Sequence, residues 1–370
     1  MNIKRIKKIE WIIPICAIIL SGISLMALYS ASYDSGLDEF KKQLMWMGIS
    51  FIVMIGVMFI DYKILVKLSP ILYGGGMIML IVVLFTEPVN GATSWFNIKD
   101  GLFSFQPAEV SKIFVILFLA YVISLIQRNG RREINRITRL ALILLTVVLP
   151  IGLIIVQPDY GTASAYIMAF LLMIFVAGIV KKYIVTAIIL VAIGIPLIYN
   201  FLLPQHAKTR IEIFLNPESD PRGAGYNVLQ SKLAIGSGQV TGMGIFNGNQ
   251  TQLGYLHPKT TDFIFSVIGE EMGFVVAGGV ILLNVIIITK CVKVAKGIKD
   301  EAGSYVAIGI AGIFLFHTLE NIGMTMGLLP ITGVPLLFVS YGGSSMLTSC
   351  ILVGILLNIS SQRKNGMFNK

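Results

Sequence analysis

The chain has 370 residues, of which 55% are hydrophobic and only 13% are charged. Its mean hydropathy is +0.82. A soluble domain carries charge at about 25% of its positions and needs it to cover its surface. The composition therefore excludes a cytosolic globular enzyme, a disordered protein and a disulfide-stapled secreted domain. It leaves a polytopic membrane protein.

Ten apolar runs are long enough to cross a bilayer as helices, which takes about 20 residues each. In chain order they cover residues 11–30, 44–60, 65–86, 107–126, 139–156, 160–180, 183–203, 262–290, 304–328 and 335–359. We therefore predict an all-α fold of ten transmembrane helices in a single domain spanning residues 1–370.

Two places along these runs allow a second interpretation. The first run follows several Lys and Arg residues at positions 4–8, as a signal peptide would, but its apolar stretch from Trp11 to Tyr29 is too long for a signal core. We expect an uncleaved first helix. Only Gln157 to Tyr160 separate the fifth and sixth runs, and Pro158 interrupts helical hydrogen bonding there. We predict a tight hairpin at this point.

The orientation follows from the basic residues. Most of the 29 Lys and Arg residues lie in the segments that face inward if the N-terminus is inside, and such segments are cytoplasmic by the positive-inside rule. We therefore predict that both termini are cytoplasmic, in a multi-pass membrane protein. The formal charge of +10 then reflects topology and contact with anionic lipid, so we predict no nucleic-acid partner.

Two predicted outer segments are longer than a simple connection requires. One runs from Glu87 to Gln106. The other covers residues 204–261, between the seventh and eighth helices, and includes a stretch from Ala224 to Ile235 that is suited to a short surface helix. Loops of this length in compact proteins are usually functional, so we expect this extracytoplasmic loop to contribute to the site.

Ionisable residues inside or at the edge of a membrane span are costly and indicate function. Glu109 and Lys112 share one helix face. They either form a self-compensating ion pair or also allow Lys112 to meet an anionic ligand from outside. Asp159, between the fifth and sixth spans, is expected to cap a helix N-terminus, with catalysis as the alternative.

Asp262 opens the eighth span, where it is either a helix cap or a general base. Ser266, Gly269 and Gly273 would share its helix face, and this small-residue strip either packs closely against a neighbouring helix or leaves room for a ligand. Nearby apolar surface would raise the pKa of the carboxyl toward a useful value. Continuing the same helix places Glu270 and Glu271 about 12 Å deeper than Asp262.

The ninth span has a polar face that we expect to form hydrogen bonds between helices, made of His317, Glu320, Asn321 and Met324. The Gly- and Pro-rich segment from Gly327 to Ser345 joins the last two spans. Irregular backbone at membrane depth must be buried in protein or line a wet cavity. Lys112, Asp159, Asp262 and this segment are therefore expected to converge near the outer leaflet, as suits an amphiphilic substrate with an anionic head.

Six stretches, in order, resemble the motifs of the SEDS proteins (shape, elongation, division and sporulation), and most of all those of the RodA branch: Phe105–Glu109 with Lys112, Gln157–Thr162, Phe214–Tyr226, Gln230–Gly238, Thr261–Phe265 with Glu270, and Pro330–Ser345. The resemblance implies a peptidoglycan glycosyltransferase that polymerises lipid II outside the membrane, in complex with a class B penicillin-binding protein. It also implies that Asp262 is the catalytic residue and that Glu109 and Lys112 pair near the substrate cavity.

Our mechanistic hypothesis uses a growing glycan on polyprenyl diphosphate as donor and lipid II as acceptor, with Asp262 as general base. Developing charge on the diphosphate needs cations, and substrate contacts are predicted for Lys112, Glu109, Asp159, Arg210, Arg222, Lys259 and Ser344. A divalent cation, Mg or Mn, could assist, and no other cofactor is expected. The competing interpretation is a flippase that transports the same lipid-linked precursor.

Overall fold

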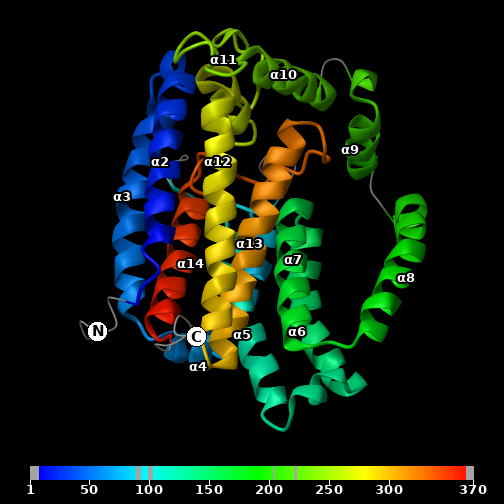
Figure 1. The fold of residues 1–370 in the computed structure, drawn as a ribbon. Coiled ribbons are helices and arrows are strands. Elements are labelled where there is room, and N and C mark those ends of the chain that lie inside the picture. Colours follow the sequence, from blue (N-terminus) through cyan, green and yellow to red (C-terminus); the bar gives the residue numbers. More distant parts are fainter. Residues whose placement is uncertain (1–7, 89–92, 99–102, 203–204, 221–222, 364–370) are drawn as a thin grey trace.

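The computed structural model describes residues 8–88, 93–98, 103–202, 205–220 and 223–363. Within these residues ten helices are long and apolar enough to cross a membrane, and they form an upright bundle (Figure 1). They are α2 (Ile12–Ala31), α3 (Asp38–Phe59), α4 (Tyr62–Val82), α5 (Pro107–Gln127), α6 (Ile137–Val156), α7 (Tyr160–Ala177), α8 (Lys181–Leu197), α12 (Ile264–Gly297), α13 (Glu301–Thr325) and α14 (Gly343–Ser361). The predicted all-α fold is confirmed.

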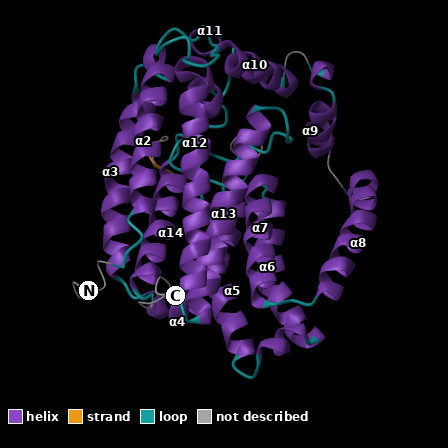
Figure 2. Ribbon diagram, in the orientation of Figure 1, coloured by secondary structure: helices purple, strands orange, loops and turns teal. Residues whose placement is uncertain are grey.

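Loops and short elements gather at the two ends of this bundle (Figure 2). The two strands, Phe96–Ile98 (β1) and Phe103–Phe105 (β2), form an antiparallel ribbon in the first long outer segment. The second long segment contains helices α9 (Gln205–Leu215), α10 (Ala224–Ser237) and α11 (Asn249–Gln252). The helix expected between Ala224 and Ile235 is therefore present, and α10 lies across one end of the bundle (Figure 1).

The core of the bundle is built around α13 and α14, in whose most apolar stretches 78% and 83% of the residues are buried. Small residues let helices approach closely without lipid between them, and a Cβ on Gly312 of α13 would lie only 2.7 Å from Ala169 Cα of α7. Helix α8 is different, because no residue in its most apolar stretch is buried. It also stands apart from the other helices of the bundle (Figure 1). Its sides are available to lipid.

The first and last described segments meet at the end of the bundle opposite α10 (Figure 1). Lys8 Nζ donates to Arg363 O at 3.0 Å, and Glu10 pairs with Lys290 at 2.6 Å and with Arg363 at 2.8 Å. Both ends on one side agree with an even number of crossings. The Lys and Arg distribution predicts that this is the cytoplasmic side.

The eighth and tenth predicted spans differ from the structure. The tenth helix was expected from residue 335, but α14 begins at Gly343 and the preceding segment is irregular. Helix α12 is interrupted at Gly273, which has a φ of 76°. The hairpin predicted at Gln157–Tyr160 is present, since α6 ends at Val156 and α7 starts at Tyr160.

Close packing of α10 on the first part of α12 makes a prediction about stability. A Cβ on Gly238 would lie 1.9 Å from Gly269 O, so Gly238→Ala should push the two segments apart and cost about 1–3 kcal/mol. Gly236→Ala is the matched control in α10, because a Cβ there meets nothing within 4 Å. Thermal unfolding of the detergent-purified protein should show a lower Tm for Gly238→Ala only, and equal Tm values would contradict the packing.

Candidate active site

The largest described cavity, about 780 Å³, opens at the end of the bundle near α9 and α10. Its walls come from parts of the chain far apart in sequence, namely Ala31, Ser35, Glu39, Ser94, Trp95, Gln106, Pro158, Asp159, Thr162, Arg210, 257–262, Thr332, Gly333, Pro335, Tyr341, Gly342, Ser344 and Ser345. The lining of the cavity therefore combines polar side chains with the irregular segment that precedes α14. This is the convergence that the sequence predicts, with one exception described below.

Asp262 lies in this cavity, half-buried and two residues before α12 begins. A Cβ on Gly333 would lie 3.5 Å from Asp262 Oδ2, and Gly333 has a φ of +73° that other residues rarely adopt. A glycine there keeps space open beside the carboxylate. Burial raises the pKa of Asp262 above its ordinary value, while a hydrogen bond from Thr261 and the charges of Arg210 and His257 partly offset this rise.

The small-residue strip after Asp262 packs against α10 and leaves no room for a ligand. Ser266 Oγ is 2.6 Å from Ser231 Oγ, and a Cβ on Gly269 would lie 3.3 Å from Ile235 Cα. Of the two alternatives for this strip, close helix packing is the one the structure contains. The space for substrate lies on the other side of Asp262, toward Thr332 and Gly333.

Glu270 and Glu271 are not placed deeper than Asp262, contrary to the uninterrupted-helix prediction. Glu270 accepts hydrogen bonds from the backbone of Gln250 and Thr251, which belong to α11. Glu271 accepts from Ser30, one residue before the end of α2. The break in α12 at Gly273 explains the difference, because the residues before the break lie against the outer segment.

Asp159 has the capping role predicted for it and also lines the cavity. Its Oδ1 accepts from Thr162 N at 3.0 Å at the start of α7, and its Oδ2 accepts from Gln106 Nε2 at 2.7 Å. Gln106 N in turn donates to Ser344 Oγ at 3.2 Å. The starts of α5, α7 and α14 are thus joined by hydrogen bonds at one wall, where Ser344 is also found.

Glu109 and Lys112 form the predicted ion pair, 2.7 Å apart, with side chains only 2% and 1% exposed. Lys112 Nζ is also 3.1 Å from His317 Nε2, and His317 Nδ1 is 2.9 Å from Pro335 O. A carbonyl can only accept, so Nδ1 carries the ring proton and Nε2 accepts from Lys112. Neither Glu109 nor Lys112 is among the described residues that line the cavity, so Lys112 reaches its wall only through His317.

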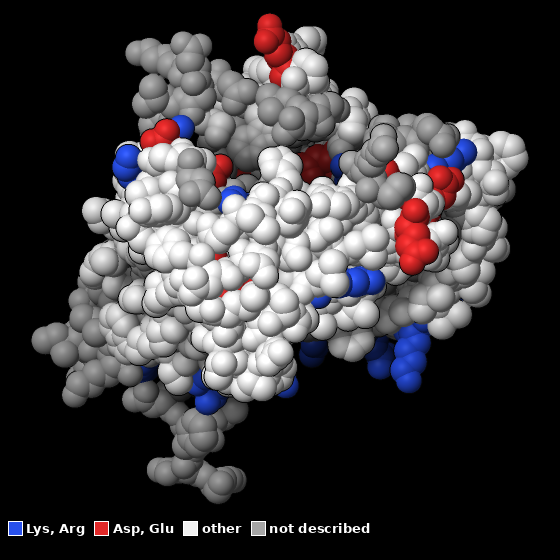
Figure 3. All heavy atoms as spheres, turned by 90° about the horizontal axis from the view of Figure 1, so that it is seen from above, with Lys and Arg blue, Asp and Glu red and all other residues white. Residues whose placement is uncertain are grey.

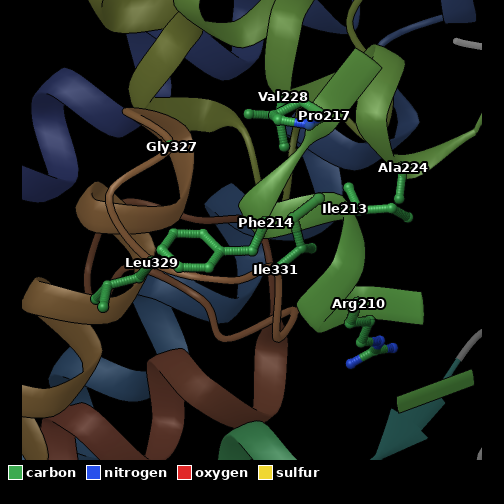
Figure 4. Close-up of a pocket in the computed structure, with 9 residues that line it drawn as sticks. All are labelled: Arg210, Ile213, Phe214, Pro217, Ala224, Val228, Gly327, Leu329 and Ile331. Carbon is green, nitrogen blue, oxygen red and sulfur yellow. The ribbon is translucent and has the colours of Figure 1, made fainter. Parts of the chain in front are cut away.

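Two of the three basic residues predicted in the long loop lie at the cavity. Arg210 of α9 is exposed. It also borders a second, much smaller pocket, and its guanidinium points away from Phe214 and Leu329, which line that pocket too (Figure 4). Lys259 lines the cavity while its Nζ donates to Thr251 O at 3.0 Å. The third, Arg222, lies outside the described residues.

Charge is sparse on the face of the molecule that bears α10 and α11. Seen from that end, most of the surface that is not drawn in grey is uncharged, and acidic and basic side chains lie mostly toward its edges (Figure 3). The cavity is lined by charges of both signs, with Arg210 and Lys259 as its basic residues and Glu39, Asp159 and Asp262 as its acids.

A model of the family described as "Cell cycle protein", covering FtsW, RodA and SpoVE, matches residues 10–365. The chain belongs to the FtsW/RodA/SpoVE family. It is 36% identical to the peptidoglycan glycosyltransferase MrdB of Escherichia coli, over 92% of this chain and 90% of that protein. It is 32% identical to the peptidoglycan glycosyltransferase RodA of Treponema pallidum, over 98% of this chain and 100% of that protein.

Solved structures of this family share the fold. One described as "Structural coordination of polymerization and crosslinking by a peptidoglycan synthase complex" matches with a TM-score of 0.82 at 25% identity, covering 97% of this chain and 99% of the other. The crystal structure of Thermus thermophilus RodA matches with a TM-score of 0.71 at 24% identity, covering 97% and 98%. The predicted SEDS family, its RodA-like branch and the enzyme class, peptidoglycan glycosyltransferase, are confirmed, in a multi-pass membrane protein.

Several residues of this FtsW/RodA/SpoVE site were not singled out from the sequence. Gln106 and Tyr341 stood inside quoted motifs without a role, and nothing in the sequence pointed to Glu39 or Trp95. His317 was expected to bond between helices, but its particular partners, Lys112 and Pro335, could only be found from the fold. Charged residues within a predicted span were enough to find the ion pair of Glu109 and Lys112. They did not show that His317 connects this pair to the cavity wall.

The buried pair predicts strong coupling between its two members. Lys112→Met should destabilise the protein by about 3–5 kcal/mol, because it leaves the Glu109 carboxylate buried without a cation. Adding Glu109→Gln should recover much of that loss. Unfolding measurements on the single and double variants test this, with the exposed pair Asp38 and Lys41 as control, where Lys41→Met should change little. Additive losses at Glu109 and Lys112 would contradict the coupling.

Proposed function

We propose that this chain polymerises lipid II into glycan strands at the outer face of the bacterial cytoplasmic membrane, for cell-shape growth. The observation that carries the proposal is the half-buried Asp262 carboxylate in a cavity of about 780 Å³ that also presents Arg210 and Lys259. A carboxylate beside cations suits the transfer of a sugar whose leaving group is a diphosphate. The family relationship supports the same chemistry.

In the proposed step, the acceptor hydroxyl of lipid II gives its proton to the Asp262 carboxylate. The oxygen of that acceptor hydroxyl forms a bond to the anomeric carbon of the donor glycan. The bond from that carbon to the diphosphate breaks, and its electron pair leaves with the polyprenyl diphosphate. A single displacement assisted by one base inverts the anomeric centre, by analogy with inverting glycosidases. A raised pKa makes Asp262 a stronger base than an ordinary carboxylate.

The remaining predicted site residues divide into two groups by position. Arg210 and Lys259 line the cavity and would stabilise the departing diphosphate, with Arg222 assigned to the same role from the sequence alone. Asp159 and Ser344 also line it, and they offer hydrogen bonds to the polar sugar head.

Glu109 and Lys112 are proposed to act at a distance from the substrate. Lys112 donates to the His317 ring, which holds Pro335 O, and Pro335 lines the cavity. The ion pair would then fix the position of the cavity wall beside Asp262. This replaces direct contact between Lys112 and the diphosphate in our mechanism.

A divalent cation is proposed only as a companion of the substrate. Within the described residues no group of three His, Cys, Asp or Glu side chains could hold a metal ion. Asp262 and Asp159 line the same cavity, and Mg or Mn can bind through one or two carboxylates together with phosphate oxygens. Such an ion would neutralise charge on the diphosphate.

The proposed partner is a class B penicillin-binding protein, which would crosslink the glycan made here. The support is the match, over 97% of this chain, to the solved structure whose description joins polymerisation and crosslinking in one synthase complex. The other proposed ligands are lipid II, the polyprenyl-diphosphate-linked glycan and the surrounding membrane lipids.

Replacing the proposed base should separate polymerisation from folding. Asp262→Ala and Asp262→Asn should abolish glycan synthesis from purified lipid II, because neither side chain accepts the proton, while the Tm stays near that of the wild type. Asp61→Asn is the control, since Asp61 is a carboxylate that caps a helix elsewhere, at α4. Wild-type protein that moves lipid II across vesicles and never yields polymer would favour the flippase.

The pH profile of polymerisation should report the charge near Asp262. The base works ionised, so kcat falls as pH drops through its pKa, and burial should place this acidic limb above the value of about 3.9 for a free Asp. Arg210 favours the ionised form. Arg210→Ala should therefore move the limb to higher pH and Arg210→Lys should not. An unmoved limb in Arg210→Ala would contradict the coupling between Arg210 and Asp262.

A further inference from the structure

The backbone around Asp262 is held at three consecutive carbonyl oxygens. Tyr341 N donates to Thr260 O at 2.9 Å, Ser340 Oγ donates to Thr261 O at 2.7 Å, and Asn321 Nδ2 donates to Asp262 O at 3.0 Å. Consecutive carbonyls of a regular helix would bond within that helix. Here every donor belongs to α13 or to the segment before α14.

Asn321 holds two segments with one amide group. Its Nδ2 also donates to Val334 O at 2.9 Å, and because both acceptors are carbonyls, only the NH₂ side of the amide can face them. Asn321 is fully buried, and its Oδ1 has no hydrogen-bond partner among the described residues. An unpaired buried oxygen is costly, so a leucine would pack there at less cost if filling space were the only need.

The position of Asn321 connects the base to the wall that faces it. Val334 follows Gly333 in the chain, and a Cβ added to Gly333 would lie 3.5 Å from Asp262 Oδ2. One amide thereby sets the separation between the backbone of Asp262 and the backbone beside its carboxylate. Asn321 itself is not among the described residues that line the cavity, so its effect on the reaction is exerted through Asp262.

We propose that Asn321 is a positioning residue for Asp262, with the Ser340 hydroxyl as its second support. The proposal rests on the proposed function of Asp262 as general base. A base displaced by about 1 Å can lose about 100-fold in rate. Because Asn321 itself does not line the cavity, the loss should appear mainly in kcat, while KM for lipid II stays near the wild-type value.

Asn358 provides a matched control for replacing Asn321. It is also a buried asparagine, its Nδ2 donates to Met58 O at 2.9 Å, and its Oδ1 accepts from Tyr62 N at 3.0 Å. It lies near the end of α14, where the first and last described segments meet. Asn321→Leu and Asn358→Leu should lower the Tm of the purified protein to a similar extent. Only Asn321→Leu should lower kcat, by about 100-fold, when equal amounts of folded protein are assayed with lipid II.

Two results would overturn the positioning role. One is an equal kcat for Asn321→Leu and Asn358→Leu, and the other is a loss in Asn321→Leu that lies wholly in KM. If Asn321→Leu does not fold, Ser340→Ala decides, because it adds no volume while it removes the bond to Thr261 O, together with the bond that Ser340 Oγ accepts from Leu336 N. It should give a smaller drop in kcat, and wild-type kcat would overturn the proposal. Wild-type protein that yields no polymer would instead overturn the proposed function.

Discussion

The irregular backbone between α13 and α14 exists at this depth because side chains of α13 satisfy its polar groups. Unpaired carbonyls away from water are costly, so irregular backbone in a membrane protein must find partners within the protein. His317 bonds Pro335 O, Asn321 bonds Val334 O, and Thr332 Oγ1 donates to Glu320 at 2.7 Å. The polar face of α13 therefore determines the shape of the wall beside Asp262.

This dependence links charge deep in the bundle to the open cavity. The charges of Glu109 and Lys112 compensate each other, and Lys112 Nζ also donates to His317 Nε2. The two nitrogens of the His317 ring bond different partners, Lys112 and Pro335 O, so the position of Lys112 also determines that of Pro335. The bonds from Lys112 to His317 and from His317 to Pro335 O join α5, α13 and the irregular segment, so we expect these three to keep one relative arrangement.

Features that depend on local sequence were predictable, and features that depend on contacts were less so. Ten apolar runs gave ten helices because the length of an apolar run is a local property. The residues from Pro335 to Ser340 are mostly apolar, as in a membrane span, but hydrogen bonds to other helices hold their backbone in an irregular path. Pro335 O bonds His317 of α13, Val339 O accepts from Ser24 of α2, and Ser340 O accepts from Gln43 of α3. The break at Gly273 likewise reflects tertiary packing, since a Cβ there would lie 2.2 Å from Gly242 N. The shared cavity of Asp262, Asp159 and Arg210 followed from topology, whereas the burial of Lys112 did not.

The place of Asp262 outside any regular helix follows from two opposing needs of a base that acts on a polar head group at a membrane. Burial must be sufficient to raise its pKa, yet the carboxylate must still meet a hydroxyl that arrives from water. A residue within a membrane-spanning helix would satisfy only the first need, and one on a surface loop only the second. Asp262 meets both because its short segment is irregular and half-buried, with its carbonyls bonded to α13 and to the segment before α14. The packing of Ser266 and Gly269 against α10 closes the other side of that segment, which leaves the carboxylate one open direction, toward the cavity.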